Sequence, residues 1–346
     1  MNQWKSIRKK YRYAVERTGC KLLFHVVPHL SRGIMVCLAR RAGALVAWLD
    51  WRGRAVGLAN LRCAYGERYT ERERRQILTR SYQNFALTMS SLFWARRLTA
   101  QNFSRWIRLK GFDELPALLP ADRQGVIFMC AHQGNWEWAS IAAGFAGLQG
   151  TVLAGRFKNT SLVETFSAAR QRSGHQIIAQ EQSMLRLFKR LKRGENVGLL
   201  IDVCNVRERG ATVVNAWGLK LALPILPATL ALRTGAAIVP LITVPRKDGT
   251  CEVIAHPPME IPATASAHEI AQRCWDVFER EINARPEFWI WSYKHFRNLP
   301  YSTTREYPFY ANSSMAFEKL QRTVELDAQE RRQVASVMEN GRFGSE

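Results

Sequence analysis

Apolar runs alternate with helical segments along the middle of the chain, and this alternation is the feature that most constrains the fold. From residue 125 onward, five short apolar runs have the length expected of buried strands. Strands that alternate with helices predict an α/β fold in which a mixed, mostly parallel sheet is flanked by helices. The predicted strands are 125–130, 151–155, 196–202, 236–244 and 251–255, and the predicted helices are 136–147, 160–173, 181–193, 223–234 and 268–284.

The segments on either side of this core are also predicted to be helical. Apolar residues recur at three- and four-residue spacing over 71–96, and Thr70 is placed to cap that helix. The polar stretch 305–346 indicates a peripheral, helical tail. We therefore divide the chain into a basic N-terminal region at 1–62, an α/β domain at 63–300 and a C-terminal tail at 301–346.

The net charge of +21 predicts affinity for polyanions such as nucleic acid, an anionic bilayer, an acidic carrier protein or a phosphorylated lipid. The charge is densest over residues 1–62, which hold 13 Lys and Arg but only two acids. Arg40 and Arg41 interrupt the most apolar stretch of this region, and an arginine at the centre of a membrane span costs about 2.5–3.5 kcal/mol. We therefore favour a basic amphipathic region that docks on the membrane, with Trp4, Trp48 and Trp51 at the interface. The alternative is an ordinary basic helix packed on the core.

One compact group of candidate catalytic residues follows the first predicted strand. His132 and Glu137 stand at a strand-to-helix turn, where the chain can fold back and bring them together. Glu137 would then accept a hydrogen bond from one imidazole nitrogen and leave the other as a general base. A lone histidine before a helix is more often structural, but Gly134 and Asn135 suit the tight turn that this pairing requires. The backbone N–H groups of Gln133 and Gly134 are placed to stabilise an oxyanion.

Other kinds of catalytic centre find no support in the sequence. The chain has no GxSxG nucleophile motif and no HExxH zinc motif, and its other histidines form no ligand cluster. The seven cysteines include no CxxC pair, which predicts reduced thiols rather than a disulfide framework. We expect no metal, and we expect the nucleophile to be a hydroxyl of the substrate.

The spacing from His132 to Glu137 resembles the H-x4-D/E motif of the glycerolipid acyltransferases. The longer string HQGNWE resembles that of the late acyltransferases of lipid A biosynthesis, and similarity to this family extends over roughly residues 20–300. Two departures stand out: Val203 replaces the glutamine that usually follows the aspartate, and residues 293–295 read YKH where the family has HRR. The other similar blocks, in the family's order, are 51–62, GRFKN at 155–159, 191–202, 232–240 and PEFWIW at 286–291.

The resemblance implies an acyltransferase that moves a fatty acyl chain from an acyl-carrier-protein or CoA thioester to a hydroxyl of a lipid A precursor or a related glycolipid, without a cofactor. His132 would be the general base and Glu137 its orienting partner. The residues implied to bind substrate are Arg156, Asn159, Asp202, Asn135 and Gln133. Two of these have ordinary structural alternatives: Arg156 as a solvated surface arginine, and Asp202 as a helix or turn cap.

The implied partners are acyl carrier protein, anionic membrane lipids and the glycolipid acceptor. The implied location is the cytoplasmic face of the bacterial inner membrane, with the protein peripheral or monotopic. The basic run at 186–193 is equally a docking patch for a carrier protein or a solvated helix face. Two alternatives remain open: an acyltransferase of another membrane lipid, such as a phosphatidylinositol mannoside, and a non-catalytic lipid- or nucleic-acid-binding protein. Against nucleic acid, the chain has no recognisable binding motif.

Overall fold

A seven-stranded sheet lies at the centre of the computed structural model, which describes residues 2–119, 125–155, 159–180, 183–204 and 210–342. The strand order is β1–β9–β8–β2–β5–β3–β4, and every neighbouring pair is parallel except the antiparallel pair β8–β9. The predicted mixed, mostly parallel α/β sheet is confirmed. The strands are β1 (Ile107–Lys110), β2 (Val126–Cys130), β3 (Gly150–Ala154), β4 (Gln176–Ala179), β5 (Asn196–Leu200), β8 (Ala237–Pro245) and β9 (Cys251–Ala255).

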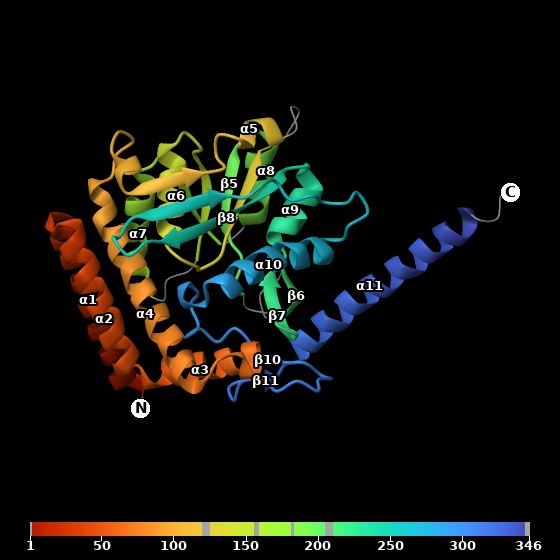
Figure 1. Cartoon of the computed structure of the whole chain (residues 1–346), viewed down its shortest axis with the longest axis horizontal. Coiled ribbons are helices and arrows are strands. Elements are labelled where there is room, and N and C mark those ends of the chain that lie inside the picture. Colours follow the sequence, from red (N-terminus) through yellow and green to blue (C-terminus); the bar gives the residue numbers. More distant parts are fainter. Residues whose placement is uncertain (1, 120–124, 156–158, 181–182, 205–209, 343–346) are drawn as a thin grey trace.

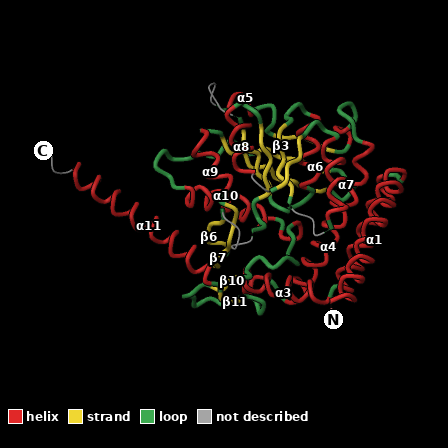
Figure 2. The backbone as a smooth tube through the Cα atoms, turned by 180° about the vertical axis from the view of Figure 1, so that it is seen from behind, coloured by secondary structure: helices red, strands yellow, loops and turns green. Residues whose placement is uncertain are grey.

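Helices cover both faces of this sheet. Because side chains alternate along a strand, Val126 and Phe128 of β2 pack on one face in a cluster that includes residues of α4, α6 and α7. Ile127 and Met129 pack on the other face with α8, α9 and α10. Figure 2 shows α6 and α7 on one side of the strands and α8 and α9 on the other. These helices are α4 (Glu71–Trp94), α6 (Trp136–Phe145), α7 (Val163–Gln171), α8 (Ser183–Lys192), α9 (Leu226–Thr234) and α10 (Ala267–Ala284); α5 (Leu115–Leu118) is a single turn.

The N-terminal helices α1 (Asn2–Val26), α2 (Arg32–Leu49) and α3 (Trp51–Tyr65) precede α4, and α1, α2 and α4 lie together at the left of Figure 1. The predicted cap of α4 is confirmed: Thr70 and Glu73 form a complete capping box. Arg32 is only 5% exposed and donates hydrogen bonds to the backbone oxygen of Gly249 and to Ser91 Oγ, which ties α2 to the β8–β9 turn. Within the part of the chain that the structure describes, no helix has the length and apolar character needed to cross a membrane.

The C-terminal part adds small elements to the main body. An antiparallel hairpin joins β6 (Ala211–Ala216) to β7 (Leu219–Pro224), and a short parallel pair joins β10 (Asn298–Leu299) to β11 (Asn312–Ser313). The long helix α11 (Met315–Arg342) begins against β6, where Phe317 is buried, and then extends away from the body (Figure 1). The side chain of Trp4 lies outside the described residues. The division of the chain at residues 62 and 300 stays a prediction.

Besides the two-residue strands β10 and β11, four strands were not predicted, and each of the four has a physical reason. β1 and β4 are four-residue strands at the two edges of the sheet, so they have partly exposed, mixed sequences. β6 and β7 belong to a separate hairpin, and β7 occupies the start of a stretch predicted to be helical from 223; the helix α9 begins only at Leu226. The other predicted strands and helices of the α/β region are confirmed to within a few residues at each end.

Candidate active site

The turn between β2 and α6 holds the histidine that the sequence singled out. His132 lies two residues beyond the end of β2 and four before the start of α6. Gly134 has a φ of +60°, and a Cβ at this position would collide with the backbone oxygen of Thr243, so only glycine fits. The Oδ1 atom of Asn135 accepts a hydrogen bond from the Trp138 N–H at 3.3 Å and caps α6. The local sequence therefore forms a fixed turn that presents His132.

His132 pairs with Asp202. The Nδ1 atom of His132 lies 2.7 Å from Oδ1 of Asp202, and the backbone N–H of His132 donates to Oδ2 at 2.9 Å. The sheet explains this contact, because β2 and β5 are parallel neighbours and Cys130 is in register with Leu200. His132 and Asp202, two positions further along each chain, therefore meet beyond the carboxyl ends of these two strands. Because a carboxylate can only accept, Nδ1 carries the proton and Nε2 is left as an acceptor.

The two groups shift each other's pKa. Burial by itself lowers the pKa of His132, but the Asp202 carboxylate, with a further contribution from Glu137, raises it above the usual 6.5. Burial by itself raises the pKa of Asp202, but the His132 charge and hydrogen bond, together with a hydrogen bond from Trp289, hold it well below its usual range. The Asp202 side chain is fully buried, whereas that of His132 is 23% exposed. The imidazole is therefore accessible and its carboxylate partner is not.

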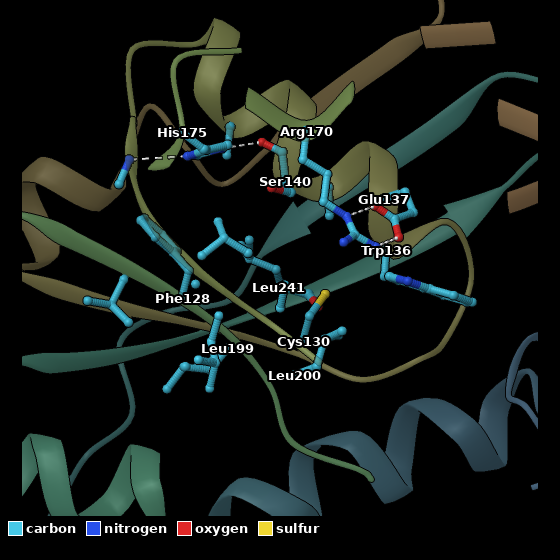
Figure 3. Close-up of a pocket in the computed structure, with 18 of the residues that line it drawn as sticks. Phe128, Cys130, Trp136, Glu137, Ser140, Arg170, His175, Leu199, Leu200 and Leu241 are labelled. Atoms are coloured by element: carbon cyan, nitrogen blue, oxygen red, sulfur yellow. Dashed lines mark hydrogen bonds and ion pairs between the residues drawn. The ribbon is translucent and has the colours of Figure 1, made fainter. Parts of the chain in front are cut away.

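The expected hydrogen bond between His132 and Glu137 is wrong. Glu137 instead forms a two-point ion pair with Arg170 of α7: Oε2 accepts from Nε at 2.9 Å and Oε1 accepts from Nη2 at 2.6 Å (Figure 3). Both side chains are largely buried, at 4% and 17% exposure. The helix α6 directs Glu137 toward α7, while the neighbouring strand β5 supplies Asp202 to Nδ1 of His132. Glu137 acts on the imidazole only through its nearby charge.

The segment that follows α10 holds this turn in place. Trp289 donates its indole N–H to Oδ2 of Asp202 at 2.8 Å. The Gly134 N–H donates to the backbone oxygen of Phe288 at 3.0 Å, and the Asn84 amide donates to the Gly134 oxygen at 3.0 Å. The expectation that the Gly134 N–H helps to stabilise an oxyanion is therefore wrong, because that donor is already used.

An apolar pocket of about 340 Å³ begins beside His132. It lies between one face of the sheet and the helices α6 and α7, and Phe85 and Met89 of α4 complete its lining. Figure 3 shows Phe128, Cys130 and Leu200 on the sheet side and the Glu137–Arg170 pair on the helix side. The pocket reaches the starts of β3 and β5, where His175 accepts a hydrogen bond from the Gly150 N–H and donates one to the Ser140 backbone oxygen.

The second predicted substrate-binding block is only partly described. Arg156 lies outside the described residues. Asn159 is 4% exposed, and its amide donates to the Tyr13 backbone oxygen at 3.0 Å and to the Glu16 carboxylate at 3.1 Å. In the structure, Asn159 therefore binds α1. A role for Asn159 in substrate binding stays a prediction.

Gln133 and Asn135 are also buried, at 3% and 2% exposure. Asn135 acts as the cap of α6, and the backbone oxygen of Gln133 accepts a hydrogen bond from the Thr243 hydroxyl at 2.7 Å. The side-chain oxygen of Gln133 is buried and has no hydrogen-bond partner among the described residues. Both residues support the turn, and direct contact with substrate stays a prediction.

Sequence reasoning missed two residues of this site. Arg170 lies 33 positions from Glu137, so no local spacing connects them. Trp289 lies within PEFWIW, a run that is informative as a signature but does not indicate which tryptophan reaches a carboxylate. Apart from that run, the sequence carries no signal that would have identified either residue.

The chain is similar in sequence to known acyltransferases. A family described as bacterial lipid A biosynthesis acyltransferase matches residues 8–298. A lipid A biosynthesis lauroyltransferase of Escherichia coli (strain K12) is 22% identical over 313 residues, which cover 86% of this chain and 95% of that protein. A phosphatidylinositol mannoside acyltransferase of Mycobacterium tuberculosis (strain ATCC 25618 / H37Rv) is 30% identical over 137 residues, or 38% of this chain. That match spans only 42% of the mycobacterial relative's length.

Proposed function

The chain belongs to the bacterial lipid A biosynthesis acyltransferase family and is an acyltransferase, and from this premise we propose that it acylates a hydroxyl of a membrane glycolipid. The donor is an acyl thioester of acyl carrier protein or of CoA. The acceptor is a lipid A precursor or a related glycolipid. The observation that carries this proposal is the His132–Asp202 pair at the mouth of an apolar pocket.

The pair supplies general-base chemistry. Asp202 fixes the tautomer of His132, so Nε2 takes the proton of the acceptor hydroxyl as its oxygen attacks the thioester carbonyl. The new C–O bond forms, the C–S bond breaks, and the imidazolium returns the proton to the departing thiolate. The buried carboxylate stabilises the imidazolium between these two transfers. Base catalysis of this kind typically contributes about 10²–10⁴-fold.

The apolar pocket suits the acyl chain of the donor. The register of the sheet places Asn196 of β5 level with Val126, six residues before His132 on β2. Six strand residues span about 20 Å, which is enough for an extended fatty acyl chain. Gly198 lies midway and has no side chain to obstruct this face. The Glu137–Arg170 pair neutralises its own charges in the pocket wall, so the wall does not repel an apolar chain.

The N-terminal helices provide the surface for membrane docking. Along α2, Ile34, Leu38, Leu45 and Trp48 are 50–71% exposed, and Trp51 of α3 is 63% exposed. An exposed apolar row of this length on a strongly basic region is typical of a helix that lies in the membrane interface. The helix α2 packs on α4, whose Phe85 lines the pocket. We therefore place the protein on the cytoplasmic face of the bacterial inner membrane, as a peripheral protein.

The basic run at 186–193 is placed less well for the donor. The backbone oxygen of Leu191 accepts a hydrogen bond from the N–H of Gly125, just before β2. The end of α8 therefore lies near the amino end of β2, whereas His132 follows its carboxyl end. A carrier protein docked on α8 would present its thioester at the end of the strand away from His132. Acyl carrier protein remains our proposed donor partner, and we interpret the run as a solvated helix face.

Transfer of a labelled acyl chain tests the proposal. The donor is the labelled acyl thioester of acyl carrier protein or, in a parallel assay, of CoA, and the acceptor is a lipid A precursor in membranes. The proteins compared are wild type, His132→Ala and the control His256→Ala, which removes a histidine from a cleft against α10. We expect product from wild type and the control, and none from His132→Ala. Product only with a total native lipid extract would assign a different acceptor. Absence of product from folded protein with every acceptor and both donors would refute the proposed activity.

A further inference from the structure

Three hydrogen bonds converge on the Asp202 carboxylate, and only one of them comes from the imidazole. Oδ1 accepts from Nδ1 of His132, whereas Oδ2 accepts from the His132 backbone N–H at 2.9 Å and from the Trp289 indole N–H at 2.8 Å. Asp202 is 1% exposed, so almost no water compensates its charge. The indole is the only side chain apart from His132 that donates to this carboxylate among the described residues.

The indole of Trp289 is held on all sides. It has no solvent exposure, and its backbone oxygen accepts a hydrogen bond from the Ser81 hydroxyl of α4. His295 stacks on the ring with centroids 3.9 Å apart and planes inclined by 22°, while Trp291 packs against it edge-on at 4.7 Å. A ring clamped in this way can fix the position of the carboxylate to which it donates.

His295 is suited to this position because it stays uncharged. Burial lowers its pKa to about 4, although the Asp202 charge and the hydrogen bond that Nε2 donates to the Ile290 backbone oxygen at 2.8 Å act in the opposite direction, so the ring is neutral near pH 7. A cation so close to Asp202 would compete with the His132 imidazolium for the same carboxylate. The neutral ring instead supports Trp289 and leaves the charge of Asp202 to His132.

We propose that Trp289 is a positioning residue, which sets the orientation and the basicity of His132 through Asp202. This inference rests on the proposed role of His132 as the general base. The Trp289 N–H takes up part of the negative charge of the carboxylate, and so moderates how strongly Asp202 holds the proton of the imidazolium. Among the residues that the structure describes, the other ionisable groups whose charges act on the pair are Glu137, Arg170, Cys130, Tyr293 and His295.

Trp289→Phe is the variant that tests this role, because it removes the N–H and keeps an aromatic ring. Without that donor the pKa of Asp202 rises and the pKa of His132 rises with it, so the acid limb of the activity profile moves to higher pH. We expect kcat to fall about tenfold or more, as for the loss of a hydrogen bond to a charged group, with KM nearly unchanged. Trp291→Phe is the matched control, because the Trp291 indole is equally buried but donates to the Pro286 backbone oxygen.

Two resonances give a readout that does not require catalysis. In ¹⁵N-labelled protein, with His132→Gln used for assignment, the imidazole of His132 is titrated in the wild type and in both tryptophan variants. We expect the pKa of His132 to be higher in Trp289→Phe than in wild type and to be unchanged in Trp291→Phe. In wild type alone, the Trp289 indole N–H should titrate with the same midpoint as His132, and this measurement stands even if Trp289→Phe does not fold.

The inference would be overturned if the pKa of His132 shifted equally in both variants or did not shift in Trp289→Phe. It would also be overturned if the indole resonance of wild type did not titrate with His132. An upward shift in a protein that transfers no acyl chain would retain Trp289 as a positioning residue and reject the proposed reaction.

Discussion

Asp202→Asn has a specific structural consequence beyond the loss of charge. Two donors, the backbone N–H of His132 and the indole N–H of Trp289, point at Oδ2. The single oxygen of an asparagine must therefore occupy the Oδ2 position, which places the amide NH2 opposite Nδ1. Because that amide can only donate, Nδ1 becomes the acceptor and the proton moves to Nε2. The base then holds a proton on the nitrogen that should receive one.

The expected loss of kcat is large, although Asp202→Asn replaces only one oxygen by an NH2 group. The variant forfeits general-base catalysis, which is worth about 10²–10⁴-fold, and it also loses the charge that stabilises the imidazolium. The equivalent tautomer inversion in a serine protease triad costs about 10⁴ in kcat. We therefore expect kcat to fall by about 10³–10⁴, or about 4–5.5 kcal/mol of transition-state stabilisation.

The pH dependence of activity distinguishes this mechanism from simple damage. In wild type, activity should fall as the pH drops through the pKa of His132, which Asp202 holds above its usual 6.5. In Asp202→Asn, only the smaller effect of the Glu137 charge still opposes the burial of the imidazole, so the pKa of His132 falls and the acid limb of the residual activity should move to lower pH. This direction is opposite to that expected for Trp289→Phe.

Steady-state kinetics from pH 5 to 9, together with circular dichroism, measures both quantities. Asp248→Asn provides the control, because Asp248 lies in the exposed β8–β9 turn. If folded Asp202→Asn kept kcat within tenfold of wild type, or kept its acid limb in place, our assignment of Asp202 would be wrong.

Three further predictions follow from the same geometry. Arg170→Gln leaves the Glu137 carboxylate buried without its partner and should destabilise the fold by about 3–5 kcal/mol in urea melts; the Glu137→Gln/Arg170→Gln double variant should recover most of this, and no recovery would show that the ion pair is not the cause. In the series Gly198→Ala, Val, Leu, competition between donors should shift preference stepwise to shorter chains, by about fourfold per excluded methylene, and an unchanged preference would place the acyl chain elsewhere. Trp48→Ser should weaken sedimentation with anionic vesicles about tenfold, whereas equally strong weakening by Leu326→Ser on α11 would argue against docking through α2.

Much of the architecture was readable from the sequence, because periodicity and capping are local properties. Thr70 as the N-cap and the apolar spacing located α4, and apolar runs between helical segments located the central strands β2, β5 and β8. The edge strands β1 and β4 were not predicted, because a strand that is buried on only part of one face has no continuous apolar run. The position of His132 at a strand-to-helix turn was also local, whereas the Thr243 oxygen that excludes a side chain at position 134 comes from β8 and is a tertiary contact.

The partners of His132 were decided by the tertiary structure alone. Sequence distance favoured Glu137, five positions away, over Asp202, seventy positions away. The order of the strands reverses this preference, because β5 lies beside β2 and brings Asp202 to Nδ1, while α6 directs Glu137 toward Arg170. Trp289 reaches the same carboxylate from the segment after α10. The sequence by itself determined which residues carry side chains suited to catalysis. The order of the strands, which depends on the packing of the whole chain, determined how those residues are paired.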